Sequence, residues 1–527
     1  MASSAIELSA RPSDGVVALR WAGEAILPSS EFLIFRGAQE DGPFQKMTSQ
    51  PLRATAWVDN QARNGSNYYY YVQPTEKSVG LTPSKTHQAT PVKFKSDAEF
   101  LNEVQHASFD YFWFEANPTN GLIRDFNSAA SCSSIAAIGF GLTAIGVGVD
   151  HSWINRESAA ARTLMTLNTL LNAPMTDADN GSSGYRGWYY HFLDFQSGVR
   201  MGKSELSSID SALLFSGIIY AREYFNSANP VEVEIRHAAN AILKRVDWKW
   251  MCNGKATLTH GWNPGTGFLP YRWVGYNEAS MLYLFGLGSS NEGLTPDSWK
   301  QWTAGYEWQT SYGFSYVHFA PLFGHQYPQC WIDFRNITDD YMRSRQITYF
   351  ENSRRATLAQ RAYAVENPRH FKGYNETSWG NTACDGPGVK GFYAYMARGT
   401  PNSEFDDGTI APTAVAGSIP FSPEVCIPTL RHLFDSYKEK LWTSYGFADS
   451  FNLQANWWSP ITIGIDQGPI VLMIENHLTG KVWETMMKAP ELQKGLQKAG
   501  FQKFDARRPQ TIMASAQPFG PPAPSRN

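Results

Sequence analysis

The first 95 residues alternate short apolar runs with turn-forming stretches. The β-branched and aromatic runs are "GVVALRWAG", "EFLIFRG", "TAWVDN" and "NYYYYVQP". The intervening stretches "EDGP" and "ARNGSN" have the composition of turns. Short strands at this spacing predict a small β-sandwich over residues 1–95, which we expect to pack against the rest of the chain.

From about residue 96 the pattern changes to helices. Ser96 is placed as an N-cap, with Glu99 three residues later as its capping-box partner. Long loops rich in Gly, Pro and aromatic residues separate the helical stretches, and loops of that length are usually functional. Further helices are predicted near 131–148, 155–172, 206–225, 231–247, 277–288, 353–366, 423–438 and 468–488.

So many successive helices are typical of a toroid of paired helices. We therefore predict a mainly α fold, an (α/α)6 barrel over residues 96–510, with a loop-built cleft at one end. Residues 511–527 are rich in proline and predict a flexible tail. A length of 527 residues fits two domains better than one.

Charge and hydropathy narrow the possible partners. Hydrophobic residues make up 43% of the chain and charged residues 18%, which is typical of a globular protein. The formal net charge of −3 gives no reason to expect nucleic acid or an anionic membrane surface as a partner. There is no run of 18 apolar residues, so we expect no membrane span. Oligomeric state is left open.

Aromatic residues are unusually frequent, at 14%, with 18 Trp and 25 Tyr. They indicate a large ring-rich core, a cleft whose flat faces stack on sugar rings, or both. The five cysteines form no CxxC pair and the 11 histidines have no metal-ligand spacing. We therefore expect no metal and no cofactor.

The start of the chain, "MASSAIELSARPSDG", lacks the basic and apolar segments of a signal peptide. This favours a mature periplasmic or secreted form to which an initiator methionine was added, with a cytoplasmic location as the alternative.

Four acidic residues stand where a loop meets a helix or within an aromatic loop: Asp210, Glu278, Glu376 and Asp466. One interpretation is structural. Asp210 and Asp466 would then serve helix starts, Glu278 would pair with Arg272, and Glu376 would be solvated. The other is that they face a cavity, because a buried carboxylate is costly unless it is paired or solvated.

Two carboxylic acids are the usual equipment for glycoside hydrolysis, in which one protonates the leaving oxygen and the other activates water or attacks the sugar. The sequence has no GxSxG, HExxH, Walker or Rossmann motif to suggest another chemistry. Glu475, further along the last helix, is predicted to be a core ion-pair acid. Sugar-binding candidates near the four acids are Glu205, Arg272, Trp273, Tyr276, Tyr374, Trp379, Asp385, Trp457, Trp458 and His325.

Several long motifs occur in a characteristic order. "GWNPGTGFLPYRWVGYNEASMLYLFGLGS", "KGYNETSWGNTACDGP" and "GIDQGPIVLMIEN" resemble the glucoamylase-like domain family, which is similar to the endo-β-1,2-glucanases of glycoside hydrolase family 144. The resemblance covers about residues 96–505. It implies an (α/α)6 barrel, no metal requirement and cleavage of a β-glucan, with the β-1,2 linkage favoured. Near the N-terminus, "LRWAG", "FLIFRG", "YYYYVQP" and "GLTPS" follow the order of a fibronectin type III module.

The resemblance also implies roles for the four acids. Asp210, Glu278 and Asp466 match acids of the family's motifs, and Glu376 matches an acid of a related transglycosylase branch. In such barrels the cleft lies at the N-terminal ends of the inner helices. As hypotheses, Glu278 is the acid or nucleophile and Asp466 the base or its partner. Asp210 and Glu376 would bind sugar or shape pKa values.

Three alternatives stay open at this point. The chain could be a hydrolase or a transglycosylase acting on another β-linked glucan, or a carbohydrate-binding protein without catalysis. The N-terminal module is not general in the glucanases. If it leaned over the cleft it could turn an endo enzyme into an exo enzyme. Endo or exo mode and the retaining or inverting outcome are not decided by the sequence.

Overall fold

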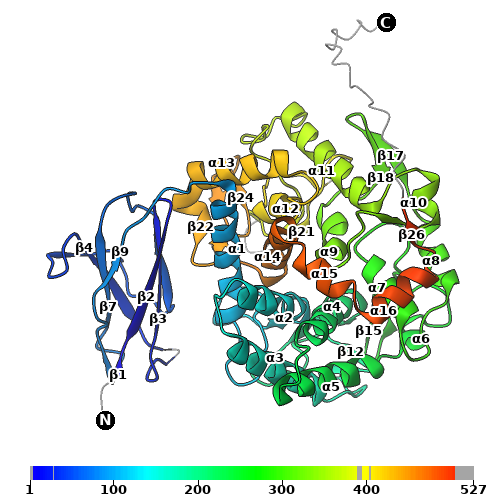
Figure 1. The fold of residues 1–527 in the computed structure, drawn as a ribbon, viewed down its shortest axis with the longest axis horizontal. Coiled ribbons are helices and arrows are strands. Elements are labelled where there is room, and N and C mark those ends of the chain that lie inside the picture. Colours follow the sequence, from blue (N-terminus) through cyan, green and yellow to red (C-terminus); the bar gives the residue numbers. More distant parts are fainter. Residues whose placement is uncertain (1–3, 28, 389–394, 403–404, 505–527) are drawn as a thin grey trace, which may run out of the picture.

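The structure, a computed structural model, describes residues 4–27, 29–388, 395–402 and 405–504. A β-rich region formed by the first strands lies beside a helix-rich domain that contains the remainder (Figure 1). The tail predicted at 511–527 falls outside the described residues.

The β-rich region contains two antiparallel sheets, with strand orders β2-β3-β6 and β5-β4-β7-β9, and a short parallel pair, β1-β8. Alternate residues of β3, Val17, Leu19 and Trp21, are buried and meet Phe32 of β4 in a small core. The strands are β1 (Ser4–Ala5), β2 (Glu7–Ser13), β3 (Val16–Ala22), β4 (Phe32–Gly37), β5 (Phe44–Lys46), β6 (Ala56–Asp59), β7 (Tyr68–Pro74), β8 (Leu81–Thr82) and β9 (His87–Ala89).

The helix-rich domain begins as the sequence predicts. Ser96 is the N-cap of α1, and its hydroxyl accepts a hydrogen bond from the Glu99 amide. The Glu99 side chain accepts from the amide of Lys95, one residue before the expected capping-box donor. The helices are α1 (Asp97–Phe114), α2 (Ile135–Asp150), α3 (Arg156–Leu171), α4 (Ser208–Tyr224), α5 (Pro230–Lys244), α6 (Trp248–Met251), α7 (Ser280–Gly288), α8 (Pro296–Thr303), α9 (Phe323–Trp331), α10 (Asp340–Ser344), α11 (Tyr349–Glu366), α12 (Pro412–Ala416), α13 (Pro423–Leu441), α14 (Gly464–Leu478), α15 (Lys481–Met486) and α16 (Pro490–Lys498).

Short strands occur in the loops of this domain, mostly as two-stranded hairpins. They are β10 (Ser133–Ser134), β11 (Gly184–Tyr185), β12 (Trp188–Tyr189), β13 (Phe192–Leu193), β14 (Leu206–Ser207), β15 (Gly261–Asn263), β16 (Gly267–Phe268), β17 (Trp308–Ser311), β18 (Phe314–Val317), β19 (Ile337–Thr338), β20 (Ala383–Cys384), β21 (Met396–Ala397), β22 (Trp442–Thr443), β23 (Gly446–Phe447), β24 (Phe451–Asn452), β25 (Trp457–Trp458) and β26 (Gln502–Lys503).

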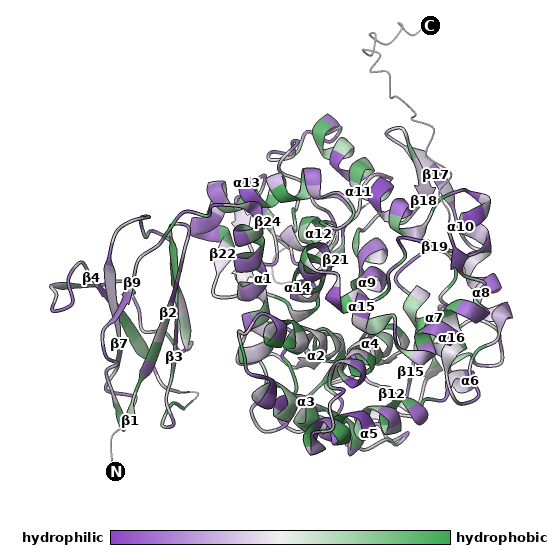
Figure 2. Ribbon diagram, viewed as in Figure 1, coloured by the Kyte–Doolittle hydropathy of each residue, from purple (hydrophilic) through white to green (hydrophobic). Residues whose placement is uncertain are grey.

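Helices α2, α4, α7 and α14 are buried on nearly all sides, and their sequences are mostly apolar, with acidic residues near the ends of α4 and α14. Helix α2 packs against α1, α4 and α14, and α4 continues the series to α7. More peripheral helices such as α5 carry both hydrophobic and hydrophilic residues (Figure 2). Among the described residues, no helix combines the length and apolar character needed to cross a bilayer.

Charged and polar side chains join the β-rich region to the helix-rich part of the chain. Arg11 contacts Asp110 of α1 at 3.0 Å, and Arg20 contacts the same carboxylate at 3.3 Å. Arg20 also donates to the carbonyl of Ser444, in the turn between β22 and β23, at 2.9 Å. Asn60 donates to the carbonyl of Trp442. The two regions therefore meet through ion pairs and hydrogen bonds to backbone, around α1 and the β22–β23 hairpin.

Candidate active site

A cavity of about 480 Å³ opens where the N-terminal ends of several buried helices meet. Ser134 and Ile463, the N-caps of α2 and α14, lie in its wall, as does Glu278, two residues before the start of α7. Helix N-termini carry partial positive charge and favour carboxylates. The lining residues are Asp125, Phe126, Ser134, His191, Phe192, Ile209, Asp210, Leu213, Glu278, Phe323, Tyr327, Ala383, Asp385, Tyr395, Ile461, Ile463 and Ile465.

Asp210 lies in the first turn of α4 and faces this cavity. The Ser207 hydroxyl donates to Asp210 Oδ2 at 2.5 Å and accepts from the Asp210 amide at 3.2 Å. The other carboxylate oxygen lies 3.5 Å from His191 Nε2. Asp210 therefore belongs both to the helix start and to the cavity, and the two interpretations made from the sequence are compatible.

His191, which the sequence analysis missed, bridges two acids. Its Nδ1 lies 2.9 Å from Glu205 Oε1, while its Nε2 faces Asp210. Burial lowers the pKa of His191, but the charges of Asp210 and Glu205 outweigh this effect and bring it to about 9. At neutral pH the ring is therefore an imidazolium held between two carboxylates.

Glu278 is buried against the cavity, with 9% of its surface exposed. Burial, with a smaller contribution from the charge of Asp210, raises the pKa of Glu278 to about 7. The alternative ion pair with Arg272 does not form, because the Arg272 guanidinium donates to the backbone carbonyls of Cys252 and Thr257. Glu278 is thus a carboxyl that can hold a proton near neutral pH.

Asp466 lies in the first turn of α14 and is 1% exposed. The N-cap is Ile463, so Asp466 does not cap this helix. Burial, followed by the neighbouring charge of Asp449, raises the pKa of Asp466 well above its usual range. Asp466 Oδ2 has no hydrogen-bond partner among the described residues. Asp466 and Asp449 are therefore two buried acids that influence each other, and neither is among the described residues that line the cavity.

The phenol of Tyr327 is influenced by the charges of three of the predicted acids. Tyr327 lies on α9 and lines the cavity. Burial, and then the charges of Asp466, Glu278 and Asp210, raise its pKa well above the usual range. Asp210 and Glu278 both line the cavity, whereas Asp466 is not among the described residues that line it.

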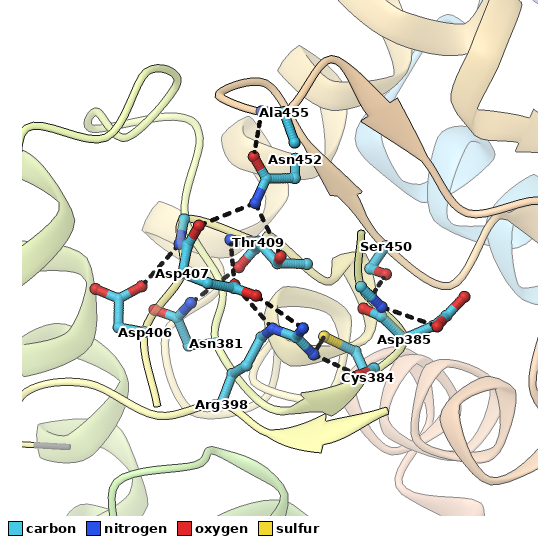
Figure 3. Close-up of polar contacts among 12 residues, drawn as sticks. Asn381, Cys384, Asp385, Arg398, Asp406, Asp407, Thr409, Ser450, Asn452 and Ala455 are labelled. Atoms are coloured by element: carbon cyan, nitrogen blue, oxygen red, sulfur yellow. Dashed lines mark hydrogen bonds and ion pairs between the residues drawn. The ribbon is translucent and has the colours of Figure 1, made fainter. Parts of the chain in front are cut away.

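Asp385 also lines the cavity, and hydrogen bonds hold its carboxylate in place. Its two carboxylate oxygens accept hydrogen bonds from the Gly386 amide at 2.9 Å and the Ser459 hydroxyl at 3.2 Å. Next to it, the buried Arg398 donates a hydrogen bond to the carbonyl of Cys384 at 2.6 Å. Arg398 also donates one hydrogen bond of 2.9 Å to each carboxylate oxygen of Asp407 (Figure 3). The Arg398–Asp407 pair therefore anchors the strands that lead into this loop.

Asp125 is a further acid of the cavity that the sequence analysis missed. Burial raises its pKa to about 6, His191 acts in the opposite direction, and Asp210 adds to the rise. It lies in a loop, where a lone acid has no periodic pattern to mark it. Asp449 was missed for the same reason.

The catalytic candidate Glu376 and several predicted binding residues are not among the described residues that line the cavity. The Glu376 side chain is 73% exposed and 4.0 Å from Arg361. Trp379 is fully buried and donates to the Thr429 hydroxyl at 2.9 Å. None of the following is among the described residues that line the cavity: Glu376, Tyr374 bonded to Asp406, Trp379, Trp457, and Trp458 stacked on Phe451.

The other predicted binding residues stand behind the cavity wall or beside it. Trp273 donates to the Ser208 hydroxyl at the start of α4, at 2.9 Å, and stacks on His260. Tyr276 contacts His325, which is fully buried and bonded to the carbonyl of Phe319. Trp273, Tyr276 and His325 support the cavity rather than line it.

One group of described side chains has the spacing of metal ligands: His191, Glu205 and Asp210, whose ligand atoms lie within 4.8 Å of one another. Both ring nitrogens of His191 already face a carboxylate oxygen. A protonated bridging ring has no lone pair for a metal ion. The contacts therefore fit an imidazolium better than a metal ligand.

Comparison with known proteins shows the family to which the chain belongs. Residues 270–490 match the family model described as "Glycoamylase: Putative glucoamylase". A solved structure titled as a putative glucoamylase from Bacteroides uniformis is 32% identical, with a TM-score of 0.72 over 78% of this chain and 99% of that chain. The chain belongs to this glucoamylase-like family, which confirms the resemblance seen in its motifs.

Two further comparisons extend over more of the chain. The crystal structure of a β-1,2-glucanase from Parabacteroides distasonis has a TM-score of 0.85 and 27% identity, covering 95% of this chain and 73% of that chain. An exo β-1,2-glucooligosaccharide sophorohydrolase (non-reducing end) from the same organism is 29% identical over 496 residues, or 86% of this chain. The match spans 66% of that protein, just under two thirds of its length.

Proposed function

We propose that this protein is a glycoside hydrolase that cleaves β-1,2-linked glucooligosaccharides and releases the disaccharide sophorose from the non-reducing end. The β-1,2 linkage and the exo mode are suggested by the name of the sophorohydrolase relative. The observation that carries the hydrolase proposal belongs to this chain. Glu278, Asp210, Asp125 and Asp385 line one cavity whose other walls are largely apolar, and the buried Asp466 lies in the first turn of α14, whose N-cap Ile463 also lines it.

In the proposed mechanism Glu278 is the general acid. Its pKa of about 7 leaves it able to donate a proton near neutral pH, as a raised carboxyl does in other glycosidases. It protonates the leaving glycosidic oxygen as the bond from that oxygen to the anomeric carbon breaks. Aromatic and aliphatic side chains such as Phe192 and Ile463 exclude water around the sugar.

The Asp449–Asp466 pair is the proposed base. Two buried acids that interact this strongly lose their protons in separate steps, so one carboxylate and one acid coexist near neutral pH. The carboxylate takes a proton from the water whose oxygen attacks the anomeric carbon. The products are then a sugar with a new hydroxyl and a shortened oligosaccharide. Proton NMR of the first anomer released distinguishes inversion from retention.

The finer architecture is also a proposal. Several buried helices that present their N-terminal ends to one cavity, with more exposed helices outside them, support an (α/α)6 barrel over residues 96–510. The strands before α1 support a separate sandwich over 1–95. Among the described lining residues none precedes Asp125, so the exo mode does not rest on the sandwich closing the cleft.

The test is hydrolysis of linear β-1,2-glucooligosaccharides labelled at the reducing end. Sophorose should appear without label from the first turnover, and β-1,3- and β-1,4-glucans should give little product. Products longer than the substrate would instead indicate a transglycosylase. Binding without new reducing ends would indicate a carbohydrate-binding protein, and either result overturns the proposal.

A further inference from the structure

We infer that Arg20 of the β-rich region is a positioning residue for the proposed active site. Through Tyr445 and Glu115 it holds in place the part of the cavity wall that carries Asp125. The inference rests on the proposed function, because its consequence is a change in turnover. Arg20 is not among the described residues that line the cavity, so it acts on the site through other residues.

The first observation is that two lining segments of the cavity are joined to each other. Asp125 and Phe126 belong to one segment, and Ile463 belongs to the other. Phe126 and Ile463 form an antiparallel β-bridge. The carbonyl of Asp125 accepts a hydrogen bond of 2.7 Å from the amide of Gly464, the first residue of α14. A displacement of Asp125 would therefore also displace the start of α14, where Asp466 lies.

The second observation is that Arg124, directly before Asp125, is anchored to the end of α1. Its Nε lies 3.3 Å from Oε2 of Glu115, the C-cap of that helix. Its amide donates to the carbonyl of Glu115 at 3.1 Å, and its own carbonyl accepts from the Tyr111 hydroxyl at 2.8 Å. Tyr111 and Glu115 therefore set the position of this part of the wall.

The third observation is that Tyr445, in the turn between β22 and β23, contacts both of these α1 residues. Its hydroxyl donates to Glu115 Oε1 at 2.6 Å, and its ring packs edge-on against Tyr111 with a centroid distance of 5.4 Å. Arg20 holds the same turn from the other side. Its guanidinium lies 4.9 Å from the centroid of the Tyr445 ring and donates to the carbonyl of Ser444 at 2.9 Å.

Arg20 is also fixed on α1, which lies beside the β-rich region in Figure 1. Its Nε lies 3.3 Å from Asp110 Oδ2, and its guanidinium lies 4.0 Å from the centroid of the Phe114 ring. The Arg20 side chain is only 13% exposed, so solvent and salt screen these contacts less than they screen a surface pair. Arg20 therefore locks the turn of Tyr445 onto the end of α1.

Arg11 is a matched control on the neighbouring strand, β2. Like Arg20, it belongs to the β-rich region and contacts the Asp110 carboxylate, at 3.0 Å. It also lies 3.0 Å from Glu103 of α1. Among the described residues, both of these ion pairs join Arg11 to α1 and neither involves the β22–β23 turn. The two arginines therefore both join the β-rich region to α1, and they differ in the contact with Tyr445.

The experiment compares Arg20→Met and Arg11→Met in the full chain. Each variant loses an ion pair with Asp110, so urea unfolding should show comparable losses of stability. For Arg20→Met we expect kcat on a β-1,2-glucooligosaccharide to fall by about 10-fold, because a misplacement of about 1 Å in a site can cost about 100-fold. Arg11→Met should keep kcat close to wild type. A merely structural role of Arg20 would lower kcat equally in both variants.

Amide hydrogen exchange gives a readout that does not depend on activity. The Asp125 amide donates to the carbonyl of Cys132, and the Gly464 amide donates to that of Asp125. In Arg20→Met, exchange in residues 122–128 and 461–465 should be about 10-fold faster than in wild type, because these segments open locally at a lower free energy. Arg11→Met should exchange there at the wild-type rate.

Tyr445→Phe tests the connection itself, and it takes the place of Arg20→Met if that variant does not fold. It removes only the hydroxyl that donates to Glu115, and it should accelerate exchange in the same two segments. In the double variant Arg20→Met/Tyr445→Phe, the loss of kcat should be smaller than the product of the two single losses, because residues in one network are not additive.

Equal kcat and equal exchange in Arg20→Met and Arg11→Met would overturn the inference, as would unchanged exchange in Tyr445→Phe. A wild type that hydrolyses no β-1,2-glucooligosaccharide, combined with faster exchange in Arg20→Met alone, would refute the proposed function and leave the positioning role of Arg20 intact.

Discussion

Helix α14 carries one buried acid near each of its ends, and the two are held in opposite ways. Glu475 is 0% exposed, and its carboxylate contacts His151 at 2.7 Å, Gln105 at 3.0 Å and Thr479 at 2.5 Å. Burial alone would raise its pKa, but the hydrogen bond with His151 and those with Thr479 and Gln105 lower it. Glu475 is therefore a fully satisfied structural acid, as the sequence predicts.

Asp466, at the other end, is 1% exposed and has an oxygen without a partner among the described residues. Its nearest electrostatic influence is another acid, Asp449, so its pKa rises where that of Glu475 falls. The comparison teaches that burial alone does not mark a functional acid. What sets Asp466 apart is an oxygen without a partner among the described residues and a second acid as its neighbour, and a functional role is one explanation for such a group in a native structure.

The largest expected effect is a loss of catalytic rate when Asp466, at the start of α14, or Glu278, just before α7, is replaced. Glu278→Gln removes the proton of the proposed acid, and Asp466→Asn removes a carboxyl of the proposed base. Both substitutions keep the size and shape of the side chain. We expect the initial rate on a β-1,2-glucooligosaccharide to fall by about 10²- to 10⁴-fold in each, with circular dichroism unchanged. Near-wild-type rates in both folded variants would refute the assignment.

The other end of α14 should respond in stability rather than in rate. Glu475→Leu removes the hydrogen-bond partner of His151 and one of the two acceptors of the Gln105 amide, and a buried polar group left unsatisfied costs about 1–3 kcal/mol. Chemical denaturation should report a loss of this order, while kcat per folded molecule stays near wild type at low temperature. A selective loss of kcat with unchanged stability would reverse the roles assigned to the two ends.

The pH dependence of stability sharpens the same contrast. The unfolded Glu278 carboxyl ionises near 4.5 and the folded one near about 7, so the folded protein holds an extra proton between these values. Stability should fall as the pH rises through this window, by about 3 kcal/mol from this group. The lowered pKa of Glu475 has the opposite effect on stability. The stability that Glu475 contributes is lost as the pH falls below the usual carboxyl range.

Unfolding of Glu278→Gln in urea at several pH values measures the first contribution. Relative to wild type, the variant should gain stability between pH 5 and pH 8, because glutamine has no proton to lose. A constant difference across this range would show that Glu278 has the same pKa in the folded and unfolded chains.

The smallest effect is expected at the exposed acid. Glu376→Gln removes a side chain that is 73% exposed and only 4.0 Å from Arg361. Such surface pairs contribute about 0–1 kcal/mol, and the rate on the glucan should not change. A large loss of rate would show that the loop of Glu376 contributes to catalysis and would contradict this prediction.

The sequence predicts well wherever a local rule applies. Ser96 caps α1, and Asp210 is placed both in the first turn of α4 and in the cavity. It predicts poorly where residue type is ambiguous. Trp379 looks like a sugar platform in a Gly-rich loop, yet its indole is buried against Thr429. His191 and Asp125 come from loops whose proximity is created only by tertiary packing.

The acid-rich cavity has a consequence for ligand binding itself. A neutral sugar that fills it displaces the water that solvates Glu278, Asp125 and their neighbours, and dehydration favours the uncharged acids. Hydrogen ions would then be drawn from the surrounding buffer as the complex forms. The heat released in a calorimeter would depend on which buffer supplies them, even though the sugar carries no charge.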